Sequence, residues 1–222
     1  MQTQFLKLLV IALAINTVSC KKENTVTEYK FEEKGIVLNC DNVNLKLYNE
    51  ALFSFEKDIE AYYGKGTPNL SRAYSQFIRS AINGRVKYED VVSKHTRNIF
   101  EVLKNETNLW DANNPKTYLN YNSPLVNCIA NNIQNKDLKT TLNALISTNS
   151  MSPKLFGSPL MTNYSAAVRD KYVAAYVAFD LYYAKLFKVD LSKVTLKKEE
   201  SKVDFNKVPP KVAPDPHAGH NH

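Results

Sequence analysis

The sequence predicts an all-α protein, a single bundle of about five to seven helices followed by a disordered C-terminal tail. Apolar residues recur at steps of three and four from residue 45 to residue 187, and no segment of useful length alternates with the period of a strand. Helices with one apolar face must bury that face against other helices. The chain of 222 residues is long enough for one domain with a full core.

The first helix is expected to begin near residue 45 and to end at Gly64 and Gly66, before Pro68. Its apolar residues form one stripe of about five turns: Leu45, Tyr48, Leu52, Phe55, Ile59 and Tyr62. Upstream, Ile36-Val37-Leu38 is either a small strand or an extended segment placed against the core, because three residues are too few to found a sheet.

Two more helices are expected before a long loop. Ser71 can cap the second, which ends near Asn83-Gly84. The third is expected from about Tyr88 to Leu103. Residues 105–122 are rich in Asn and contain Pro115, which predicts a loop.

The second half opens with Ser123-Pro124, a cap followed by proline in the first turn, and this pair predicts a fourth helix. Asp137 can cap a fifth helix, and residues 153–161 form a short helical turn or an irregular link. The last helix is expected over about residues 163–187. From residue 191 to residue 222 the periodicity stops, which predicts a disordered tail.

The charge pattern argues against a nucleic-acid partner. The formal net charge is +7, but Lys197-Lys198 is followed at once by Glu199-Glu200, and no segment carries a concentrated basic block. A weak attraction to anionic envelope lipids or glycans remains an alternative.

Catalytic signatures are missing from the chain. It has no G-x-S-x-G, no G-x-x-x-x-G-K and no G-x-G-x-x-G motif. His95 is the only histidine of the folded region and lies on the inner face of the third helix, where we expect a core residue with one hydrogen bond. We therefore predict no catalytic residue, no required cofactor and no enzymatic activity, with a small enzyme that uses His95 as acid or base as the alternative.

The C-terminus carries His217, His220 and His222 within six residues. These imidazoles can capture Zn, Cu or Ni weakly, because Gly219 leaves their geometry unfixed. The other interpretation is an uncommitted polar terminus.

Several tyrosines lie on or beside the predicted core faces. They can line a ligand cleft, or they can be core residues with hydroxyls at the rim. The set is Tyr62, Tyr63, Tyr74, Tyr172, Tyr176, Tyr182 and Tyr183.

The N-terminus contains Lys7, an apolar run over residues 8–15, and Ser19 directly before Cys20. The run is too short to span a membrane, which takes about 20 residues. This pattern resembles the signal peptide of a bacterial lipoprotein, although Thr17 stands where that family usually has Leu. The resemblance implies that Cys20 becomes the acylated (palmitate-bearing) first residue after removal of residues 1–19. Plain secretion with cleavage after Ala14, or a retained anchor, are the alternatives.

Two cysteines remain after lipidation of Cys20. Outside the cytoplasm, Cys40 and Cys128 can pair as a disulfide, and two buried free thiols are the alternative.

These observations divide the chain into four parts: a signal peptide (1–19), a lipidated tether (20–34), a helical domain (35–190) and a disordered tail with a His-rich end (191–222). The expected function is a non-enzymatic binding or assembly component of the cell envelope, with the membrane and an envelope protein as partners. By the same resemblance, Lys21 after the anchor favours the outer membrane, with the domain facing the periplasm or the cell exterior.

Overall fold

The computed structural model describes residues 26, 28–64 and 68–194, and it confirms the all-α class. No strand occurs in this part of the chain, where the only β-type pairing is an isolated antiparallel bridge between Trp110 and Leu119. The expected loop at residues 105–122 contains that bridge. The predicted tail is described only for residues 191–194, so residues 195–222 lie outside the described part.

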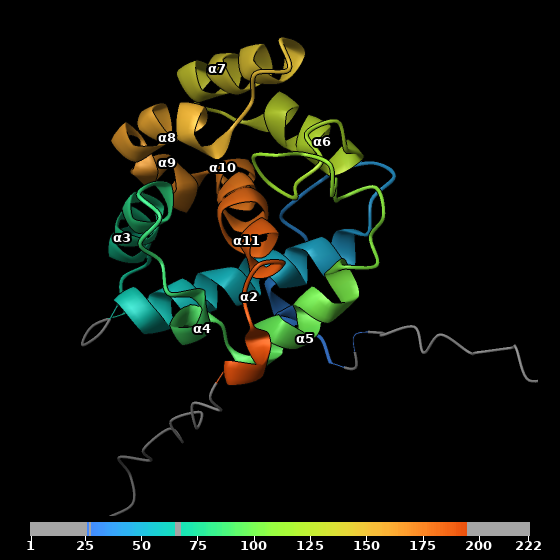
Figure 1. Cartoon of the computed structure of the whole chain (residues 1–222), viewed down its shortest axis with the longest axis vertical. Helices are drawn as coiled ribbons and strands as arrows, with labels where there is room; N and C mark the ends of the chain where they lie inside the picture. The colour runs from blue at the N-terminus through green and yellow to red at the C-terminus, as the bar shows by residue number, and fades with distance from the viewer. Residues whose placement is uncertain (1–25, 27, 65–67, 195–222) are drawn as a thin grey trace, which may run out of the picture.

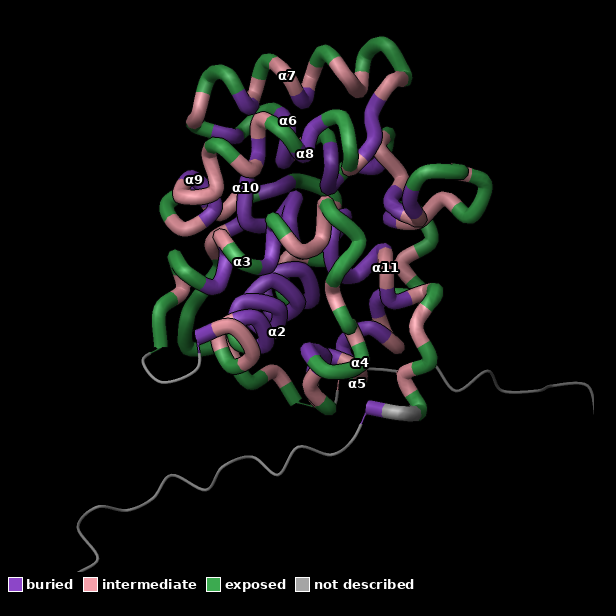
Figure 2. The backbone as a smooth tube through the Cα atoms, turned by 60° about the vertical axis from the view of Figure 1, so that its left-hand side comes forward, coloured by how far each residue is buried: buried purple, intermediate pink, exposed green. Residues whose placement is uncertain are grey.

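Helix α2 (Leu45–Tyr63) is the central element of the bundle. The last helical run of the chain crosses α2 in Figure 1, and α3, α4 and α5 pack along it. Twelve of its 19 residues are buried, which Figure 2 shows as an almost continuous purple tube. Four of the six residues of the predicted stripe are buried, while Leu45 and Tyr62 are half-buried. The buried set of α2 also includes five polar residues: Asn49, Glu50, Ser54, Glu56 and Asp58.

The next helices confirm the predicted order but not every boundary. Helix α3 (Leu70–Ile82) is capped by Asn69, whose side chain accepts from Arg72 N, and not by Ser71. The expected third helix is two helices, α4 (Tyr88–Val91) and α5 (Lys94–Leu103). The break occurs because Ser93 caps α5 and its own backbone N–H donates to Asp58.

Three further helices follow the loop. Helix α6 (Pro124–Asn132) begins after the predicted Ser123 cap. Helix α7 (Lys136–Ser147) is capped by Asn135 and not by Asp137. Residues 153–161 belong to a helix, α8 (Pro153–Thr162), whose Gly157 lies so close to Ile82 of α3 that a Cβ there would be 3.0 Å from the isoleucine side chain.

The predicted last helix is interrupted. It consists of α9 (Tyr164–Arg169), α10 (Lys171–Tyr176), a π-helical segment (Val177–Tyr183) and α11 (Ala184–Leu186). Asp170 separates α9 from α10 because its carboxylate accepts from Tyr172 N and, across the bundle, from Gln134 N. A 3₁₀ turn at Leu191–Lys193 follows.

The segment before α2 lies against the bundle. A 3₁₀ turn spans Glu32–Lys34, and Ile36-Val37-Leu38 is extended, with the N–H groups of Val37 and Leu38 donating to the Asn49 side chain. The sequence suggested a tether over residues 20–34. Lys30 and Phe31, which fall in that range, donate to Glu50 of α2 and therefore belong to the folded body.

Candidate functional site

The predicted site residues fall into two groups. Cys20, His217, His220 and His222 lie outside the described residues, so the lipidation and metal predictions stay predictions. Cys40, Cys128 and His95 are described.

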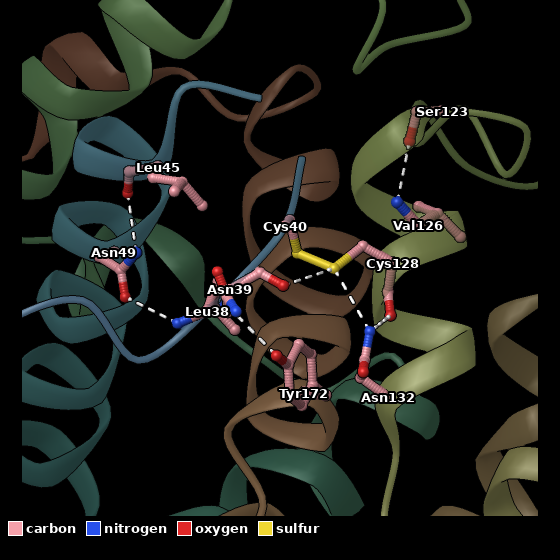
Figure 3. Close-up of a disulfide and its surroundings, with 10 residues drawn as sticks. All are labelled: Leu38, Asn39, Cys40, Leu45, Asn49, Ser123, Val126, Cys128, Asn132 and Tyr172. Carbon is pink, nitrogen blue, oxygen red and sulfur yellow. Dashed lines mark hydrogen bonds between the residues drawn. A yellow bond between two sulfur atoms is a disulfide. The ribbon is translucent and has the colours of Figure 1, made fainter. Parts of the chain in front are cut away.

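Cys40 and Cys128 form a disulfide with a Cα–Cα distance of 5.7 Å. Figure 3 shows the bond joining the extended segment before α2 to helix α6, with Tyr172 beside it. The Tyr172 hydroxyl accepts from Asn39 N at 3.3 Å, so a hydrogen bond supports the segment next to the covalent link. The bond closes a loop with a sequence separation of 88 residues.

His95 faces Glu50 of α2. Its Nε2 lies 2.6 Å from Glu50 Oε1, and the two side chains are 12% and 2% exposed. The Glu50 carboxylate also accepts from Lys30 N at 2.7 Å and from Phe31 N at 3.1 Å. Burial opposes ionisation of Glu50, but the bonds from His95 and the two backbone N–H groups outweigh it and hold the pKa of Glu50 below its ordinary value.

This arrangement matches the core histidine that the sequence predicts. The Phe31 ring packs edge-on against His95, with 6.0 Å between the ring centroids. The contacts of His95 are therefore those of a residue that fastens the N-terminal segment to α2 and α5.

Asp180 is fully buried in the π-helical segment. It accepts from Thr117 Oγ1 and Tyr176 Oη at 2.7 Å, and from Tyr121 Oη at 3.1 Å. Burial raises its pKa, although the hydroxyl donors and the charge of Lys185 counteract part of that effect. Through these bonds Asp180 fixes the long loop on the bundle.

Asp58 forms a second buried polar cluster. Its Oδ2 accepts from Tyr182 Oη at 2.7 Å and from Ser93 N at 3.0 Å. Nearby, Ser54 Oγ and Thr96 Oγ1 are 2.6 Å apart. Burial raises the pKa of Asp58, against the opposing effect of its hydrogen bonds from Thr96, Ser93 and Tyr182.

Four of the seven tyrosines are buried in the core, three are half-buried, and none of the seven lines either of the two clefts described below. Tyr74, Tyr176, Tyr182 and Tyr183 are fully buried. Their hydroxyls point inward, to Glu56, Asp180, Asp58 and the Ala51 carbonyl respectively, and not to the rim as the packing interpretation expected. Burial raises the pKa of each of these tyrosines.

Sequence reasoning missed Asp58 and Asp180 as structural residues. The available signal was an acid inside an apolar run, next to Ile59 in one case and next to Phe179 in the other. Throughout the described residues every buried side-chain nitrogen and oxygen has a partner, and no group of three or more His, Cys, Asp or Glu is placed to hold a metal. Each buried acid of the described residues therefore has a hydrogen-bond partner within the fold.

Two of the clefts on the surface of the described bundle bear on ligand binding. The smaller, about 230 Å³, lies beside Tyr48, Glu106 and Ser123. Its Glu106 carboxylate already accepts from Tyr48 Oη at 3.3 Å and from Asn44 Nδ2 at 3.2 Å. The larger, about 550 Å³, lies where α3, α4, α8 and the π-helical segment meet. Only the larger falls in the usual range of ligand sites, about 300–1,000 Å³.

The chain matches no protein-family model, no curated protein and no solved structure. Among the described residues, no helix has both the length and the apolar character needed to cross a membrane.

Proposed function

We propose that this chain is a lipid-anchored protein of a bacterial envelope, in which acylated Cys20 attaches a helical, non-enzymatic binding or assembly domain to the outer membrane. The observation that carries the proposal is the Cys40–Cys128 disulfide, in a chain whose first 23 residues resemble a lipoprotein signal region. Disulfides of this kind persist outside the cytoplasm, which is where a lipoprotein signal delivers its protein.

The contacts of the N-terminal segment support an anchored body. Glu50 binds Lys30 and Phe31, Asn49 binds Val37 and Leu38, and the disulfide fixes Cys40. Two of these attachments join the segment to α2 itself, and the disulfide joins it to α6.

Metabolic labelling with a palmitate analogue tests the proposal. We expect the label in the membrane fraction, its loss in Cys20→Ala, and its retention in the matched variant that carries Cys40→Ala and Cys128→Ala. Lys21→Asp should move the labelled protein to the inner membrane. Recovery of unlabelled wild-type protein in the cytosol would reject the proposal.

A metal-capturing lipoprotein is the second candidate, and the observation that favours it is the spacing of His217, His220 and His222. Calorimetric titration with Zn and Cu, on the full chain and on a chain ended after Pro214, separates it from the first. Heat that disappears with the truncation supports metal capture, and equal heat from both chains rejects it.

A further inference from the structure

The larger cleft combines apolar walls with lysines at its edge. Its apolar side chains come from the end of α3, the turn after it, α4 and the π-helical segment. They are Ala81, Ile82, Val86, Tyr88 and Leu181, with Pro153 at the start of α8. Lys116, Lys154 and Lys185 lie in the same lining, and none of the lining residues is acidic.

The neutral polar groups of the lining are already bonded within the protein. The Tyr88 hydroxyl donates to the Leu181 carbonyl at 2.7 Å, and the Ser152 hydroxyl accepts from Leu155 N as the cap of α8. Of the three cations, Lys116 contacts the Met151 carbonyl at 3.4 Å. The lining therefore offers ammonium groups that could bind an anion and apolar side chains that could bind a hydrocarbon.

A second observation concerns the backbone beside the cleft. Leu181 belongs to the π-helical segment, and Lys185 follows it in α11. π-Helical turns are rare and occur frequently at functional sites. Here the segment also places Asp180 in the core, next to the residue that lines the cleft.

We infer that this cleft binds a fatty acid of about ten carbons, with the carboxylate at Lys116, Lys154 and Lys185 and the hydrocarbon chain along Ile82, Val86 and Leu181. The carboxylate head of such a ligand can pair with the lysines, since no residue of the lining is acidic. Its apolar tail can pack against the apolar side chains. The inference deepens the proposed binding function, and it rests on that function for the source of the ligand, the lipid of the envelope.

The test uses the full acylated chain in nanodiscs of zwitterionic phosphatidylcholine, titrated with radiolabelled decanoate against empty discs. We expect saturable binding to the wild type. The variant with Lys154→Gln and Lys185→Gln should bind about tenfold more weakly, the loss that two partly exposed charge pairs correspond to. Lys136→Gln, an exposed lysine of α7 outside the cleft, is the matched control and should bind as the wild type does.

Two further measurements distinguish the contribution of the charged head from that of the apolar tail. Decyltrimethylammonium, which has the same chain length with a cationic head, should not bind, and Val86→Ser should weaken decanoate binding while the lysines are intact. Melting curves of each variant identify any that fail to fold, and the Lys154→Gln single variant then replaces the double one. The same variants are also measured in discs that contain anionic phosphatidylglycerol. If the lysine substitutions change binding only in these discs, the lysines form a patch that binds the lipid surface and not a fatty-acid site.

The inference is overturned if decanoate binding is not saturable, if the lysine variants bind as the wild type does, or if only anionic discs respond to them. These results are independent of the palmitate labelling. An unlabelled protein that binds decanoate would reject the anchor and keep the cleft, and a labelled protein that does not bind would do the reverse.

Discussion

Glu50 and Asp180 are both buried carboxylates, yet their surroundings move their pKa values in opposite directions. Glu50 lies where the N-terminal segment meets α2, and its partners are an imidazole and two backbone N–H groups. Asp180 lies at the centre of the bundle, and its hydrogen-bond partners are three hydroxyls. Burial acts on both, but only the first set of donors outweighs it.

The two carboxyl groups have different structural roles. At the edge, an ionised carboxylate fastens a segment that leads toward the proposed membrane anchor. At the centre, the carboxyl of Asp180 accepts hydrogen bonds from hydroxyls of the loop and of α10. These bonds fix the position of the loop on the bundle and the orientation of Tyr121 and Tyr176.

The largest effect is expected at the edge, from the disulfide. Replacing Cys40 and Cys128 together by Ser should lower the free energy of unfolding by roughly 4–5 kcal/mol, since an uncrosslinked unfolded chain regains the entropy of a long loop. Guanidinium denaturation measures the change, and reductant should reproduce it in the wild type. Equal stability in the two proteins would mean that the edge is held by Glu50 and packing alone.

Loss of the central carboxyl comes next. Asp180→Ala leaves the hydroxyls of Thr117, Tyr121 and Tyr176 buried without their acceptor, and we expect a loss of about 3 kcal/mol. Asp137→Ala, an exposed acid of α7, is the control and should change stability by less than about 0.5 kcal/mol. Hydrogen exchange should accelerate in residues 109–123 first. A variant as stable as the control would show that the hydroxyls find other partners.

The sequence predicts the features of the fold that depend on local signals, and it does not predict those that depend on distant contacts. Helical periodicity and Ser123-Pro124 are local signals, and the helices that they predict are present. The predicted caps, Ser71 and Asp137, lie two residues after the caps in the structure, Asn69 and Asn135. Asparagine caps a helix as well as serine or aspartate does, so the sequence alone does not distinguish these candidates.

Features that depend on distant partners escaped prediction. The break before α5 requires Asp58, 35 residues away, to accept from Ser93 N. The break at Asp170 requires the backbone N–H of Gln134 to donate to the Asp170 carboxylate. The direction of the tyrosine hydroxyls follows from where the acids lie in space, which a single sequence does not specify. The larger cleft is likewise assembled from four separate stretches of the chain.

A smaller effect is expected from Glu50→Gln. The amide keeps an acceptor oxygen but loses the charge that His95 and the N–H groups of Lys30 and Phe31 bind, so stability at neutral pH should fall by about 1–2 kcal/mol. The amides of Lys30 and Phe31 should exchange faster, while those of α10 stay protected. Uniform acceleration across the chain would contradict the assignment of Glu50 to the N-terminal segment.

The smallest effect is a difference in pH dependence. The pKa of Glu50 is lowered in the fold, so its contribution is complete above its ordinary value of 4.5 and is lost as the pH falls through the lowered one. The pKa of Asp180 is raised, so its protonated form favours the fold, and stability is lost as the pH rises from the ordinary value of 3.8 through the raised one. Stability differences from the wild type, measured in urea between pH 3 and pH 7, should therefore shrink toward low pH for Glu50→Gln and grow toward low pH for Asp180→Asn. Parallel curves for the two variants would mean that both carboxyls titrate alike, and the distinction between edge and centre would fail.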